Sequence, residues 1–265
     1  MPIQIGGSKP PFFGVHDGAG DVFMYYNLAR YLAPEQPVYG LQPQGLDGKQ
    51  APHTRISDMA AQYVREIRTV QPEGSYFLGG YSFGGKVAFE MAQELHAQGQ
   101  KVAMLALFDA SGPGWFKPLS FQASVGQHLA NLLRLEPKQK LTYLQKRLAR
   151  RIYFDNRQPL PQTDHKSPLM EVLEQASRDY VPQVYPGRAI LFQASEQTVE
   201  YLEWEEWWGF DPQLDWGRLV AGGLDIHKIP GHHFNIFNEP YIGVLAKKLQ
   251  VSLDRIQANL DANRP

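Results

Sequence analysis

The sequence predicts an α/β fold, with a mostly parallel central sheet, helices on both faces and a helical lid insertion. Over most of the 265 residues, short apolar runs alternate with amphipathic helical patterns, which is typical of a parallel sheet covered on both faces. The alternation stops from Trp115 to about Tyr185, where only helical patterns occur. The first residues are rich in Gly, Ser and Pro and lack periodicity. We therefore expect a linker at 1–9 and one domain at 10–262, with the lid at about 115–185.

Six apolar runs are short and bounded by turn-forming residues, as strands are. The run Val102–Phe108 is nearly continuous and ends in Asp109, as expected of a central parallel strand with a polar residue at its carboxyl end. In chain order, the expected strands are 12–16, 37–42, 76–78, 102–108, 188–194 and 224–229.

The clearest helical pattern covers residues 57–70, where apolar side chains fall on one face and Ser57 is a candidate N-cap. Up to residue 108, the helical patterns separate successive strands, which favours parallel connections. In chain order, the expected helices are 21–32, 57–70, one that follows Ser82 and has apolar positions from Val87 to Leu95, three in the lid at about 121–135, 137–153 and 168–180, and one from about Glu239.

The composition excludes several classes of protein. A net charge of -1 gives no electrostatic argument for binding nucleic acid or a membrane surface. Cysteine is absent, so there is no disulfide framework and no thiolate nucleophile, which suits a reducing cytoplasm. No run approaches the roughly 18 apolar residues of a membrane span, and the N-terminus lacks the features of a signal peptide. We expect a soluble, cytoplasmic protein in which a serine does any nucleophilic work.

The segment from Gly80 to Gly84 has the pattern G-x-S-x-G, centred on Ser82. An apolar run precedes it and an amphipathic pattern follows it, so the serine is expected on a sharp turn from a strand into a helix. Flanking glycines keep such a crowded turn free of Cβ atoms and leave the hydroxyl exposed. This context predicts that Ser82 is a nucleophile rather than part of an ordinary glycine-rich turn.

A serine nucleophile needs a base and an acid that orients the base. Ser82, Asp109 and one of the pair His232–His233 follow the chain order Ser, Asp, His, and each comes just after a predicted strand. Glu196 follows the next strand and is a second candidate for the acid. The other histidines share neither a common spacing nor a carboxylate cluster, so no metal is expected.

Six segments carry a resemblance to a known family: FFGVHDGAGDVFMYYNLARYL, QPVYGLQPQGLDG, YFLGGYSFGGKVAFEMAQEL, LALFDASGP, YVPQVYPGRAILFQAS and IPGHHFNIFNEP. Together they resemble the thioesterase domains that end nonribosomal peptide and polyketide synthases, which have the α/β-hydrolase fold. The resemblance covers nearly the whole chain except the middle of the lid and the Trp-rich segment at 200–208.

The resemblance implies a role for each site residue. The family's acid follows the strand after the elbow helix, which favours Asp109 over Glu196. Its base is the histidine of a PG-x-H-F loop, which matches His233. Its oxyanion donors are two backbone N–H groups, which correspond to those of Phe83 and Gly18.

The resemblance also implies a reaction and a partner. The family releases an acyl, peptidyl or polyketide chain from a phosphopantetheine arm through a serine acyl-enzyme, by hydrolysis or cyclisation. No cofactor of its own is implied, because the arm belongs to an acyl or peptidyl carrier protein domain, and a place at the C-terminus of a larger synthase is expected. Asp17 departs from the small or proline residue that often precedes Gly18 in the family.

Two other functions stay open. A small-molecule carboxylesterase or lipase-like hydrolase would share every catalytic residue, and a non-catalytic carrier-docking module would lack one of the three groups. Seven basic residues between Arg134 and Arg151 suit either a solvated helix face or a docking surface for an acidic carrier protein. The tryptophans within 204–208 suit either a buried helix or a wall for the acyl chain.

Overall fold

The computed structural model describes residues 1–114, 167–196 and 211–262, together with Leu129, Leu132, Leu133, Leu135, Lys140 and Leu141. The chain divides into two compact units. The first comprises Met1–Pro113, Ser167–Glu196 and Gln213–Pro265, and the second comprises Gly114–Lys166 and Gln197–Pro212. Nearly all of the second unit lies outside the described residues, including most of the predicted helices at 121–135 and 137–153, the basic run and the Trp-rich segment.

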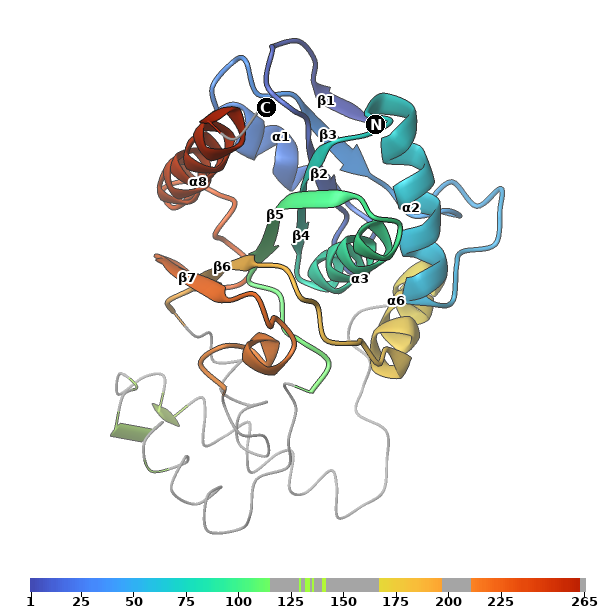
Figure 1. Cartoon of the computed structure of the whole chain (residues 1–265). Helices are drawn as coiled ribbons and strands as arrows, with labels where there is room; N and C mark the ends of the chain where they lie inside the picture. Colours follow the sequence, from blue (N-terminus) through green and yellow to red (C-terminus); the bar gives the residue numbers. More distant parts are fainter. Residues whose placement is uncertain are drawn as a thin grey trace. The chain divides into compact units, whose positions relative to one another are not determined.

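The first unit is built on a seven-stranded sheet with the order β1-β3-β2-β4-β5-β6-β7 (Figure 1). All neighbouring strands are parallel except β1, which pairs antiparallel with β3 at one edge. The α/β prediction with a mostly parallel sheet is confirmed. The strands are β1 Pro2–Gln4, β2 Phe12–Val15, β3 Val38–Leu41, β4 Ser75–Tyr81, β5 Lys101–Phe108, β6 Ala189–Ala194 and β7 Leu224–Ile229.

Helices cover both faces of this sheet (Figure 1). On one face, α1 (Met24–Ala29) and α8 (Ile242–Ala262) share a buried apolar cluster with β2, β4, β5, β6 and β7. On the other face lie α2 (Ile56–Val70) and α3 (Phe83–Ala97), and α6 (Pro168–Asp179) packs against α3. A short 3-10 helix, η1 (Trp216–Arg218), precedes β7. Among the described residues, no helix is long and apolar enough to cross a membrane.

Strand β5 shows why the central strands are apolar along their whole length. Phe108 and Met104 belong to the cluster under α1 and α8, whereas Leu107 faces the α3 glycine Gly85 on the opposite side. Alternate side chains are therefore buried on opposite faces, as a parallel sheet covered on both sides requires. This packing ends at Asp109, which places a carboxylate at the carboxyl edge of the sheet.

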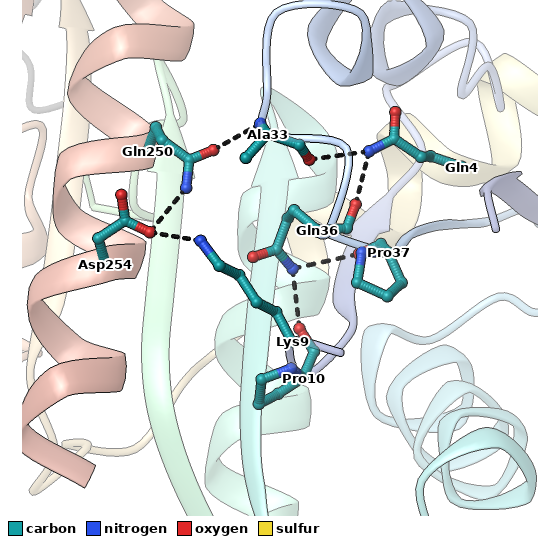
Figure 2. A network of polar contacts seen from close by, with 8 residues as sticks. All are labelled: Gln4, Lys9, Pro10, Ala33, Gln36, Pro37, Gln250 and Asp254. Atoms are coloured by element: carbon teal, nitrogen blue, oxygen red, sulfur yellow. Dashed lines mark hydrogen bonds and ion pairs between the residues drawn. The ribbon is translucent and has the colours of Figure 1, made fainter. Parts of the chain in front are cut away.

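The prediction of a linker at 1–9 is wrong for its first residues. Met1 exchanges backbone hydrogen bonds of 2.8 and 2.9 Å with Gly40 of β3, so the segment extends the sheet as β1. Side chains then tie the same segment to the loop before β3 and to α8 (Figure 2). Gln4 donates to the carbonyls of Ala33 and Gln36, and the Lys9 ammonium lies 2.7 Å from a carboxylate oxygen of Asp254.

The first two helices do not start where the sequence predicts. The first helix begins at Met24 rather than near Asp21, because the preceding residues form turns in which Tyr25 and Tyr26 donate to carbonyls three residues back. The second begins at Ile56 with Arg55 at the N-cap position, so Ser57 lies inside the helix and is not its cap.

The predicted lid extends too far toward the C-terminus. Helix α6 falls within the predicted range 115–185, yet it belongs to the compact unit that contains the sheet. The Lys86 ammonium of α3 donates to the Ser177 hydroxyl of α6 at 2.6 Å, and the Tyr180 hydroxyl donates to Glu90 of α3 at 2.7 Å. These contacts pack α6 against α3, within the compact unit that contains the sheet.

Candidate active site

Ser82 occupies a sharp turn between β4 and α3. Its backbone is at φ 54° and ψ −117°, a conformation that residues with a Cβ rarely adopt. The Ser82 N–H donates to the Phe108 carbonyl at 3.1 Å, which fixes the turn against the end of β5. A Cβ on Gly80 would overlap the Gly84 carbonyl, and a Cβ on Gly84 would overlap the His16 carbonyl. The two glycines of the motif are therefore required by close backbone approaches on both sides of the serine.

Asp109 directs its carboxylate at a histidine from a distant part of the chain. Its backbone N–H donates to the Phe192 carbonyl at 2.8 Å, and its Oδ1 accepts from the Ala194 N–H at 2.8 Å. Its Oδ2 lies 2.7 Å from Nδ1 of His233. Because one contact to β6 fixes the backbone of Asp109 and another fixes its carboxylate, the carboxylate can hold the imidazole in one orientation.

The His233 ring is held by Tyr81, the residue before Ser82. The two rings stack with centroids 5.0 Å apart, and the Tyr81 hydroxyl donates to the His233 carbonyl. Burial, followed by the charge of Asp109, raises the pKa of Tyr81, so the hydroxyl keeps the proton that it donates. With Nδ1 donating to Asp109, the neutral imidazole has its acceptor nitrogen at Nε2, as a general base requires.

Glu196 and His232, the alternative candidates for the acid and the base, have other hydrogen-bond partners. Glu196 is exposed, and its Oε1 accepts from the Gly231 N–H at 3.0 Å, so this carboxylate braces the turn at φ 94° before the histidines. The His232 Nδ1 accepts from the Phe234 N–H at 3.3 Å within the same loop. Of the two candidate acids, Asp109 is thus the one in contact with His233.

The loop after β2 lies against the start of α3 and leaves one N–H group unused. Asp17 Oδ1 accepts from the N–H groups of Ala19 and Asp21, the Asp17 carbonyl accepts from Gly20, and the Asp17 N–H donates to the Asp21 carbonyl. Among residues 16–21, the Gly18 N–H is the one backbone donor that has no hydrogen bond to another described residue. A Cβ built on Gly18 would sit 3.8 Å from that of Phe83, so Gly18 adjoins the first residue of α3. The Asp17 side chain thus shapes the loop where the family often has a small residue or proline.

Ser82 and Asp109 follow the neighbouring strands β4 and β5 at the carboxyl edge of the sheet, where His233 contacts Asp109. The model of the Thioesterase domain family matches residues 10–249. The chain belongs to the thioesterase domain family. The resemblance predicted from the six sequence segments is confirmed.

Similar proteins are parts of large synthetases. Malpibaldin synthetase of Mortierella alpina is 27% identical over 255 residues, which are 96% of this chain and only 4% of that protein. A four-domain nonribosomal peptide synthetase has the same fold, with 24% identity and a TM-score of 0.68 over 95% of this chain and 20% of its own. The NocB thioesterase domain, solved as a covalent complex with a fluorophosphonate nocardicin G analog, is 25% identical, with a TM-score of 0.61 and coverage of 93% and 96%. The predicted α/β-hydrolase fold is confirmed by these structures.

Two residues of the thioesterase domain were not predicted from the sequence to belong to its site. Tyr81 supports His233, and the only signal for it was its place next to the nucleophile. His16 is fully buried and stacks on Phe83 with ring centroids 5.6 Å apart, although the sequence placed it only beside a glycine loop.

Proposed function

We propose that this thioesterase domain releases an acyl, peptidyl or polyketide chain from a phosphopantetheine thioester through an acyl-enzyme on Ser82. The observation that carries the proposal is the 2.7 Å contact between Asp109 and His233 beside the Ser82 turn, in a chain of the thioesterase family. Asp109 orients the imidazole, His233 is the general base, and Ser82 is the nucleophile.

The first half of the reaction forms the acyl-enzyme. His233 Nε2 takes the proton of the Ser82 hydroxyl while Oγ attacks the thioester carbonyl, so an O–C bond forms and the carbonyl oxygen becomes an oxyanion. The N–H groups of Phe83 and Gly18 stabilise this oxyanion, and one such donor is typically worth about 3 kcal/mol. The C–S bond then breaks, and the leaving sulfur takes the proton from His233.

The second half of the reaction releases the acyl chain from Ser82. A water molecule, or a hydroxyl or amine of the bound chain, attacks the ester carbonyl and gives its proton to His233. The C–Oγ bond breaks and Ser82 regains a proton, which yields a free acid or a cyclic product. One set of catalytic residues serves both outcomes, so the choice depends on which nucleophile reaches the ester.

The partner in this proposal is an acyl or peptidyl carrier protein domain. Support comes from the relatives, which are multidomain synthetases far longer than this chain. The phosphopantetheine arm is then part of the substrate, and the thioesterase domain needs no cofactor of its own.

Comparing thioesters with matched oxyesters tests the reaction class. We expect acyl thioesters to be processed with the higher kcat/KM, and Ser82→Ala to remove turnover of both substrates by a thousandfold or more, as loss of a triad nucleophile does. A higher kcat/KM for the oxyesters would instead indicate a carboxylesterase.

A further inference from the structure

His16 lies directly under the proposed oxyanion hole. It follows β2, its side chain is 0% exposed, and its N–H donates to the Leu41 carbonyl of β3 at 3.1 Å. Its ring stacks on the ring of Phe83 at 5.6 Å and 28° and meets the edge of Tyr63 at 6.0 Å. The backbone of His16 is therefore anchored in the sheet, and its side chain is enclosed by aromatic rings.

The imidazole holds the peptide unit that carries the Gly18 N–H. His16 Nδ1 lies 2.7 Å from the Asp17 carbonyl oxygen, which can only accept, so Nδ1 donates. Carbonyl and N–H of one trans peptide unit point in opposite directions. Because the Asp17 carbonyl is held toward His16, the N–H of Gly18, which lies in the same plane, is directed away from His16.

The proton has only one favourable place on this ring. Nε2 is buried and has no hydrogen-bond partner among the described residues, so a proton there would be an unsatisfied buried donor. Burial also lowers the pKa of His16 to about 4, which keeps the ring neutral near pH 7. At neutral pH the ring is a fixed Nδ1–H donor.

We propose that His16 is a positioning residue for the oxyanion hole, which orients the Gly18 N–H through its hydrogen bond to the Asp17 carbonyl and supports Phe83 by stacking. The inference rests on the proposed function, because it assigns these two N–H groups to the oxyanion. His16 contacts no reacting atom and acts only through the peptide unit and the ring that it holds.

Two amide substitutions separate the hydrogen bond from general packing. The amide nitrogen of asparagine stands as many bonds from Cβ as Nδ1, whereas that of glutamine corresponds to Nε2. We expect His16→Gln to lower kcat on an acyl thioester by at least tenfold with little change in KM, since losing an oxyanion donor outright typically costs about a hundred- to a thousandfold. His16→Asn should retain most of kcat. His16→Phe keeps the stacking but has no donor, so its kcat should fall as that of His16→Gln does.

The control is His53→Phe, because His53 is only partly buried and its Nε2 contacts Gln62 outside the site. It should leave kcat unchanged, and melting temperatures should show that each variant is folded. Equal kcat values for folded His16→Asn and His16→Gln, at the wild-type level or equally reduced, would overturn the proposal. Failure of the proposed function looks different, because Ser82→Ala would then keep wild-type turnover whatever stands at position 16.

Discussion

The ammonium group of Lys86 is buried, and burial destabilises its charged form. Lys86 is the fourth residue of α3, near the positive end of the helix dipole, and only 9% exposed. Its Nζ donates to the Ser177 hydroxyl of α6, and burial lowers its pKa from 10.5 to about 8. This shift corresponds to about 3 kcal/mol of lost stability when the group is charged. Lys86→Met removes that cost and loses one hydrogen bond worth about 1 kcal/mol, so we expect a gain of about 2 kcal/mol at pH 7.

The sign of the pH dependence follows from proton binding. Between pH 8 and 10.5 the unfolded chain holds a proton on Lys86 that the folded chain has lost, so the free energy of unfolding rises with pH in this window. The stability lost by burying the charged Lys86 ammonium is fully present below pH 8 and disappears above pH 10.5. By pH 10 only about 1 kcal/mol of it remains, and the advantage of Lys86→Met should be close to zero.

Denaturant unfolding followed by circular dichroism measures the stability change caused by Lys86→Met at pH 7 and at pH 10. The matched control is Lys101→Met, because Lys101 is exposed at the start of β5, and it should change stability by less than about 0.5 kcal/mol at either pH. If Lys86→Met is destabilising at pH 7, or if its gain is the same at both pH values, the buried charge does not cost what we infer.

Two further predictions assign the acid and the base. Asp109→Asn should lower kcat by about ten-thousandfold, because an amide in contact with Nδ1 favours the wrong tautomer. Glu196→Gln should change kcat little, since among the described residues its carboxylate accepts only from the Gly231 N–H; loss of activity in this variant alone would reverse the assignment. His233→Ala should abolish turnover of an acyl thioester, whereas His232→Ala should only perturb it, because the contacts of its ring to described residues lie within its own loop. The opposite ranking of the two histidine variants in steady-state kinetics would move the base by one residue.

Much of the sheet could be predicted because its central strands are apolar on both faces, and the run at 102–108 misses β5 by one residue. The run at 224–229 coincides with β7, an edge strand in which apolar and polar residues alternate. The exception is β1, whose three residues carry no pattern and become a strand only through pairing with β3. Short elements at a sheet edge depend on tertiary contacts that a local pattern does not contain.

The site was also predicted only in part, because some of its residues are identified by tertiary contacts and not by a local pattern. The elbow has a local signal, since its glycines are required by close backbone approaches. Asp109 and Glu196 could not be separated by position, because both follow neighbouring parallel strands; the hydrogen bonds to Ala194 and Gly231 distinguish them. The burial of Lys86 also had no signal in the sequence, because it depends on packing between α3 and α6, which lie about 90 residues apart.

The central claim is that Ser82 carries the acyl group between the two halves of the reaction. Intact-protein mass spectrometry after brief exposure to an acyl thioester and an acid quench tests it directly. We predict that the wild-type protein gains the mass of one acyl group less one hydrogen, that fragmentation places it on Ser82, and that Ser82→Ala gains none. An acyl group on another residue, or the same mass gain in Ser82→Ala, would contradict the account.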